Sequence, residues 1–146
     1  MPAHPGRYDS LHKLATHHEQ AALRELGRAQ EALAGAERKF AELEGYLAQY
    51  AGTTYNGQST SVVQATNRIR FMQRLREAVC QQAIAVRRAE ERVARCRQTW
   101  LGRRQECGSF DKLNERALVE RDTRERRCEQ EILDEFGARP LGLAAR

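Results

Sequence analysis

The sequence has few of the large apolar residues from which globular cores are built, and no long run of them. Leu, Ile, Val and Phe together supply 27 of its 146 residues, a smaller share than most folded domains use. No stretch of 18 apolar residues occurs, so no membrane span is expected. The first nine residues also lack the apolar run of a secretory signal. A compact enzyme with a deep pocket is therefore not expected.

Proline is missing from most of the chain, because the three prolines are Pro2, Pro5 and Pro140. No helix between the two ends is therefore interrupted by proline. Ala, Glu, Lys, Leu and Arg together supply 76 of the 146 residues, a composition typical of long helices and coiled coils. The net charge of +5 results from 25 basic and 20 acidic residues and is too small to indicate disorder.

Motifs for catalysis, cofactors and metals are also missing. The sequence contains no phosphate-binding loop, dinucleotide fingerprint, nucleophile elbow or HExxH zinc motif. None of its four cysteines has the CxxC spacing of a zinc site, and on one helix they lie too far apart for a disulfide. The adjacent His17 and His18 would point about 100° apart on a helix. We therefore expect no catalytic residue, no cofactor and no metal site, and free thiols, which are typical of the cytoplasm.

The first third of the chain carries the heptad pattern of a helix that packs against another helix. Apolar residues recur there at alternating intervals of four and three, as the a and d positions of a coiled coil do. A cap at Asp9 or Ser10 and a stop at Gly52 predict a helix over about residues 10–51. Its a and d residues are Ala22, Leu26, Ala29, Leu33, Ala36, Phe40, Leu43, Leu47 and Tyr50, continued less regularly toward the N-terminus by Leu11, Leu14, Ala15 and His18.

A second heptad helix follows. Ser61 and Gln64 fit a capping box, in which each side chain covers a free backbone N–H of the other residue. With stop signals at Gly137 and Pro140, this helix is predicted over about residues 62–136. Its a and d residues are Met72, Leu75, Val79, Gln82, Val86, Ala89, Val93, Cys96 and Trp100, with an approximate continuation through Cys107, Phe110, Leu113, Ala117, Cys128 and Ile132.

The connection between the helices is short and polar. It covers residues 52–61 and contains the turn dipeptide Asn56-Gly57. Two heptad helices joined in this way predict an all-α fold, an antiparallel coiled-coil hairpin. We expect a single domain over residues 1–146, which ends in a tail at 137–146.

The different lengths of the two helices leave part of the second one without a partner. Continuous pairing would place Tyr50 near Val63 and Leu11 near Gly102. The second helix would then extend past the first by about 30 residues, or about 45 Å. Three explanations remain open for this extension: a partner chain, a frayed end, or cover by the N-terminal tail at residues 2–9.

Arginine is concentrated in the first half of the second helix. Between Arg68 and Arg104, eleven arginines and three glutamates give a net charge of +8, whereas the segments before and after it sum to −1 and −2. This segment is either the solvated outer face of a coiled coil, with pairs such as Glu91–Arg95, or a binding face for an acidic protein. Nucleic acid is not expected, because no stacking aromatic residues lie among the arginines. The residues assigned to an acidic partner are Arg87, Arg88, Arg92 and Arg95.

Apolar residues near the connection exceed what the pairing of two helices needs. Tyr46 and Phe71 lie beside the a and d positions rather than at them. They either widen the packing between the helices or form an aromatic patch that contacts a partner.

Three stretches of the chain have a familiar order and spacing. They are Glu44-Gly-Tyr-Leu-Ala-Gln-Tyr50, Asn67-Arg-Ile-Arg-Phe-Met-Gln-Arg-Leu-Arg-Glu-Ala-Val-Cys-Gln-Gln82, and Glu129-Gln-Glu-Ile-Leu-Asp-Glu135. Through them the chain resembles the FliJ family of the flagellar type III export apparatus over about residues 8–140. Lys39 and Gln82 differ from the commoner residues of that family.

The resemblance implies a hairpin similar to the central stalk of rotary ATPases. It implies a non-enzymatic protein that binds the export ATPase ring and the export gate in the membrane, and that assists the cycling of substrate chaperones. Such a protein is cytoplasmic and associates peripherally with the inner face of the cell membrane through its partners. The residues that the resemblance implies for gate binding are Lys39, Leu43, Tyr46, Tyr50, Phe71, Leu75, Ala78 and Gln82.

Two other functions stay open on the sequence alone. One is a generic coiled-coil chaperone or adaptor without a flagellar role, which includes the stalk of a virulence-type injectisome. The other, less favoured, is a basic helical protein that binds nucleic acid. Flagellar export genes beside this one would favour the flagellar function.

Overall fold

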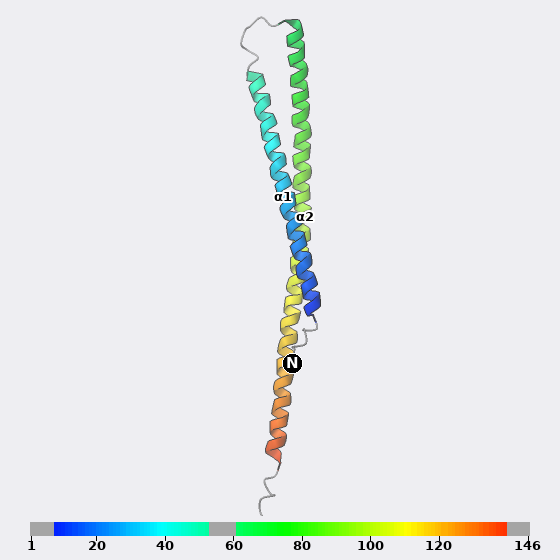
Figure 1. Cartoon of the computed structure of the whole chain (residues 1–146), viewed down its shortest axis with the longest axis vertical. Helices are drawn as coiled ribbons and strands as arrows, with labels where there is room; N and C mark the ends of the chain where they lie inside the picture. The colour runs from blue at the N-terminus through cyan, green and yellow to red at the C-terminus, as the bar shows by residue number, and fades with distance from the viewer. Residues whose placement is uncertain (1–7, 53–60, 140–146) are drawn as a thin grey trace, which may run out of the picture. The chain divides into compact units, whose positions relative to one another are not determined.

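The computed structural model describes residues 8–52 and 61–139. They form two helices, α1 (Asp9–Gly52) and α2 (Val62–Ala138), and no strand occurs among them (Figure 1). The bounds differ from the predicted ones by at most two residues. None of these helical residues forms a segment apolar enough to cross a membrane.

The start of α2 has the Ser61 half of the predicted capping box. The Ser61 hydroxyl oxygen accepts a hydrogen bond from the backbone N–H of Gln64 at 3.3 Å, which satisfies a donor that has no partner inside the helix. The predicted turn at Asn56-Gly57 lies outside the described residues.

The contacts divide the chain into two units, and both helices contribute to each. The larger unit is Gln20–Gly102. The smaller unit combines Met1–Glu19 with Arg103–Arg146.

In the larger unit the two helices pack antiparallel. Glu25 of α1 lies near Arg92 of α2, and Ala36, farther along α1, contacts Gln82, which comes earlier on α2. Every predicted a and d residue of this unit is buried or half-buried except the last of α1, Tyr50. Small residues at several of these positions let the helices approach closely, although they bury little area. The tightest cluster comprises Leu26, Ala29 and Val93, with Leu33, Cys96 and Trp100 packed against it.

Gln82 is the polar a/d residue that the sequence singled out, and it bonds across the hairpin. Its side-chain Nε2 donates to the backbone carbonyl oxygen of Ala36 at 2.9 Å. Because a polar group at a helix interface costs stability unless it finds a partner, this bond favours the one register in which the two residues face each other.

The predicted register near the connection is wrong. Tyr50 does not lie beside Val63; its ring packs edge-on against Phe71, with 4.9 Å between ring centroids. Arg68 Nη2 also donates to the Tyr50 carbonyl oxygen at 3.3 Å, whereas Val62 and Val63 are exposed. The first two turns of α2 lack a regular a/d pattern. The partner of Tyr50 on α2 is therefore Phe71, which lies eight residues after the predicted partner Val63.

The smaller unit corrects the prediction for the start of α1. Leu11, Leu14 and His18 are exposed, and only Ala15 of the predicted residues is buried. The pairing of Leu11 with Gly102 is also wrong, because the neighbouring His12 faces Asp111.

These predictions for the start of α1 are wrong because the heptad phase of each helix continues unchanged through polar residues. A continuous helix cannot shift its phase to follow irregular apolar residues, because each residue turns it by about 100°. Intervals of three and four therefore bring polar side chains to the interface at His12, Glu19, Arg103 and Asn114, all of which are half-buried. The other a/d residues of this unit are Tyr8, Ala15, Cys107, Phe110 and Ala117.

Beyond Ala117, helix α2 has no apolar interface. All residues from 118 to 139 are exposed, so the extension is shorter than the predicted 30 residues. The heptad positions there are mostly charged, with Arg121, Arg124, Cys128, Glu131 and Glu135. Pairs spaced four residues apart support the helix locally, such as Arg126–Asp122 at 3.0 Å and Gln130–Asp134 at 3.0 Å.

Two leucines of α1 test which of its residues face α2. Replacement of the buried Leu26 in Leu26→Ala should lower the free energy of unfolding by about 2–3 kcal/mol, because it leaves a cavity in the tightest part of the core. Leu14→Ala should cost less than about 0.5 kcal/mol, because Leu14 is exposed. Urea denaturation followed by circular dichroism measures both values, and equal losses for the two variants would contradict the assigned phase.

Candidate functional site

The eight residues expected to form a contact surface divide into an inward and an outward group, and all lie in the larger unit. The inward group, which is buried or half-buried, comprises Leu43, Leu75, Ala78 and Gln82. The outward group, which is exposed, comprises Lys39, Tyr46, Tyr50 and Phe71. Inward residues contribute to the pairing of the helices, whereas the outward group leaves most of its accessible surface to a partner while the hairpin stays paired.

Three aromatic residues of the outward group form what we call the aromatic cluster: Tyr46, Tyr50 and Phe71. Their exposed fractions are 53%, 43% and 45%. Tyr46 and Tyr50 are four residues apart and therefore share one face of α1, and Tyr50 contacts Phe71 of α2 edge to face. Aromatic rings with this much exposed area are typical of surfaces that bind proteins, because they combine a large apolar face with few rotatable bonds.

A shallow, open hollow lies beside the aromatic cluster on α1. It is lined by Glu42, Gly45, Tyr46 and Gln49, which are spaced so that they share one side of the helix. Gly45 leaves the space empty: a Cβ atom there would meet nothing within 4 Å. Its backbone has no positive φ, so the helix itself does not require glycine.

The four arginines assigned to an acidic partner form what we call the arginine face. All four are exposed, and at about 100° per residue they span about 140° of the α2 circumference. That arc is centred opposite the interface residues Val86, Ala89 and Val93. Its members are Arg87, Arg88, Arg92 and Arg95.

Few ion pairs neutralise the arginine face. Arg92 Nη2 lies 3.8 Å from Glu25 Oε2 across the hairpin, and Glu25 also pairs with Arg28 at 2.5 Å. The expected Glu91–Arg95 pair does not form among the described residues, although Glu91 falls within the same arc. Exposed pairs of this kind contribute at most about 1 kcal/mol, so most of the positive charge stays available to a partner.

The hollow was not predicted from the sequence, although Gly45 is a signal of it. Gly45 stands inside a strong heptad pattern, where glycine costs about 1 kcal/mol relative to alanine. An exposed helical glycine whose backbone does not require it is the signal that the sequence offered at this position.

The comparisons with known proteins agree with the fold. A family model described as "Flagellar FliJ protein" matches residues 4–144 of the 146-residue chain. No curated protein matches the chain. The family match spans both helices and nearly all of the sequence. The chain therefore belongs to the flagellar FliJ protein family, whose members are components of flagellar protein export.

Proposed function

We propose that the chain is a stalk and adaptor of the flagellar export apparatus, without enzymatic activity. It binds the cytoplasmic domain of the export gate through the aromatic cluster and the export ATPase ring through the arginine face, and it assists the cycling of substrate chaperones. Its association with the inner face of the cell membrane is peripheral and depends on these partners.

The observation that carries this proposal is the exposure of the aromatic cluster. The a and d residues form the interface between the two helices in the larger unit. Tyr46 and Phe71 do not belong to that set. Two half-exposed aromatic side chains such as these contribute little to the free energy of folding. A partner that covers them gains the free energy of burying their apolar area. Lys39 lies on the same helix and is exposed, so it adds a charge at the edge of the contact.

The arginine face supports the contact with the ATPase ring. It occupies the outside of α2, where a ring that surrounds the hairpin would meet it. Guanidinium groups bind carboxylates with two parallel hydrogen bonds, so an acidic inner surface of the ring is the matching chemistry.

The exposed segment 118–139 supports the role with chaperones. It has no apolar stripe of its own at the heptad positions, but Leu118, Ile132 and Leu133 are exposed on it. A helical partner can bury these residues, which the chain itself leaves uncovered among its described residues.

The first test separates binding from folding at the aromatic cluster. Tyr46→Ala and Phe71→Ala should each weaken binding to the cytoplasmic domain of the export gate about 10- to 30-fold, because each removes an aromatic contact. Both variants should melt within a few degrees of the wild type. Leu47→Ala, which truncates a half-buried a/d residue, should do the reverse and lower the Tm with little direct effect on binding.

Calorimetric titration and thermal melting of the same preparations give both numbers. The gate contact is wrong if Tyr46→Ala and Phe71→Ala bind as the wild type does. The aromatic residues belong to the folding core if these variants melt as early as Leu47→Ala.

The hollow at Gly45 gives a second test. Gly45→Ala should stabilise α1 by about 0.5–1 kcal/mol, because alanine loses less backbone entropy than glycine, and it should weaken gate binding by narrowing the hollow. Gly27→Ala is the matched control, since a Cβ there also meets nothing within 4 Å. It should stabilise the helix by a similar amount and leave gate binding unchanged. Equal affinities for the two variants would show that the hollow is not part of the contact.

The arginine face is tested by charge reversal. Replacing Arg87, Arg88, Arg92 and Arg95 by Glu should weaken binding to the export ATPase by at least about 10-fold at low salt and reduce the salt dependence of the affinity. Helicity by circular dichroism should not change.

Four arginines of the exposed segment provide the control for this change of charge. Reversal of Arg121, Arg124, Arg126 and Arg127 alters the net charge by the same amount and should preserve ATPase binding. If both quadruple variants lose affinity equally, the attraction depends on net charge and not on the arginine face.

A further inference from the structure

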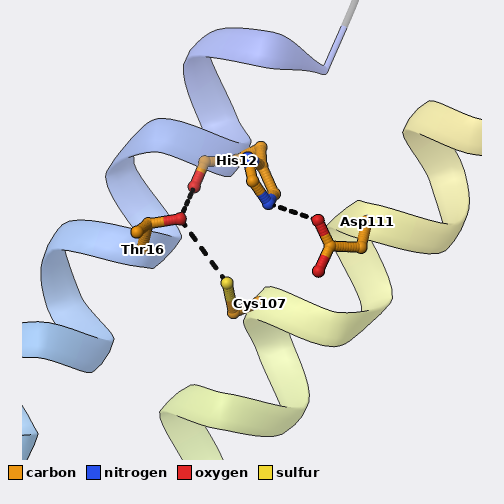
Figure 2. Close-up of polar contacts among 4 residues, drawn as sticks. All are labelled: His12, Thr16, Cys107 and Asp111. Atoms are coloured by element: carbon orange, nitrogen blue, oxygen red, sulfur yellow. Dashed lines mark hydrogen bonds and ion pairs between the residues drawn. The ribbon is translucent and has the colours of Figure 1, made fainter.

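Four polar side chains from the two helices meet in the smaller unit (Figure 2). His12 and Thr16 come from α1, and Cys107 and Asp111 come from α2. His12 Nε2 lies 2.5 Å from Asp111 Oδ1, and Thr16 Oγ1 lies 3.5 Å from Cys107 Sγ. The ligand atoms of His12, Cys107 and Asp111 all lie within 4.8 Å of one another.

The helix geometry explains this convergence. Each pair on one helix is four residues apart and therefore points to the same side, and Figure 2 shows both pairs directed toward each other. The spacing of the cysteines along the sequence did not indicate a metal site, because His12 lies more than 90 residues before Cys107 and Asp111 in the sequence.

We propose that His12, Cys107 and Asp111 bind a divalent transition metal ion of the zinc class. An imidazole nitrogen, a thiolate sulfur and a carboxylate oxygen are the three donor types that zinc uses in proteins. Calcium and magnesium require several oxygen ligands, and this group offers one carboxylate. Three protein ligands leave a fourth tetrahedral position open to water.

The distances between the ligand atoms fit such an ion after small rotations of the side chains. Two ligand atoms of a tetrahedral zinc ion are about 3.3–3.6 Å apart, given metal–ligand bonds of about 2.0–2.3 Å. The observed separations extend from 2.5 Å to at most 4.8 Å and therefore bracket that value. The side chains of His12 and Asp111 are 28% and 59% exposed, so they can move by about 1 Å, whereas the buried Cys107 is a fixed anchor.

Thr16 is a positioning residue beside the thiol. Its single hydroxyl hydrogen goes to the His12 carbonyl oxygen at 2.9 Å, so in the short contact between the two side chains the Cys107 thiol donates to Thr16 Oγ1. When a metal ion binds, the thiol proton leaves to solvent and His12 Nε2 must carry no proton. The Thr16 hydroxyl can then turn and donate to the thiolate, which such hydrogen bonds stabilise.

A metal ion here would act as a structural link between the helices. Ala15 and Cys107 are the buried apolar residues of this unit's described part, so the hydrophobic contribution to its pairing is small. A bond from α1 to two residues of α2 would add the free energy of metal binding to the stability of the unit. This inference does not depend on the proposed function in export.

The test is a titration of the full chain, stripped of metal by a chelator, with CoCl₂ and ZnCl₂. Co²⁺ should bind one equivalent and produce a thiolate-to-cobalt charge-transfer absorption band, and Zn²⁺ should displace it with a Kd of about 1 µM or below. Zinc at 100-fold above Kd should raise the Tm by roughly 5–10 °C.

Single replacements identify the ligands. His12→Ala, Cys107→Ala and Asp111→Asn should each weaken Zn²⁺ binding about 100-fold or more, and Cys107→Ala should abolish the charge-transfer band. Thr16→Val should weaken binding about 10-fold, and Thr16→Ser should restore it. His18→Ala and Cys128→Ala are the matched controls, since both residues are exposed and lie outside the group, and should bind as the wild type does.

Two results would overturn the proposal. One is the absence of the charge-transfer band or a Kd for Zn²⁺ weaker than about 100 µM in the wild type. The other is binding that survives His12→Ala and Asp111→Asn, which alter exposed or half-buried side chains and therefore test the site even if Cys107→Ala fails to fold.

Discussion

The structure depends on the fixed phase of two helices that no proline interrupts. Once a few close contacts such as Leu26 and Ala29 with Val93 are made, each helix must present every third and fourth residue to the other, whatever its chemistry. Apart from Gln82, apolar residues fill the a and d positions of the larger unit up to Tyr50, and polar residues such as His12 and Asn114 fill several of them in the smaller one. The interface is consequently narrow, and it gains specificity from polar contacts such as Gln82 with Ala36.

The same constraint decides which side chains are left for partners. Residues that lie off the a and d positions are covered less by the other helix, and Tyr46 and Phe71 keep about half of their surface exposed. The arginine face lies opposite the interface for the same reason. Both surfaces proposed to bind partners therefore face outward, which suits a component of flagellar protein export.

The sequence predicted the helices, the cap at Ser61 and the a/d residues from Ala22 to Trp100, because a regular apolar pattern carries that information directly. It did not predict the register, because Val62 and Val63 look like interface residues although no partner covers them. It also included Leu11, Leu14 and His18, which are exposed, whereas the helix phase brings His12 to the interface together with the predicted Ala15. The group of His12, Cys107 and Asp111 could be predicted only from the correct pairing register of the helices. Its members are polar and far apart in the sequence, so no local pattern connects them. The residues proposed to bind the export gate were expected from the family resemblance. The structure adds that four of them are exposed.

The central claim is the register that the helix phase sets, and a distance between spin labels tests it most directly. In a variant without native cysteines, one label is placed at the exposed residue Ala48 and the second at either Gln73 or Ala65 of α2. Pulsed electron paramagnetic resonance should give the shorter distance for Ala48 with Gln73, because Tyr50 pairs with Phe71, and the Ala65 label should be displaced by about 12 Å along the helix axis. A shorter distance for Ala48 with Ala65 would contradict the account.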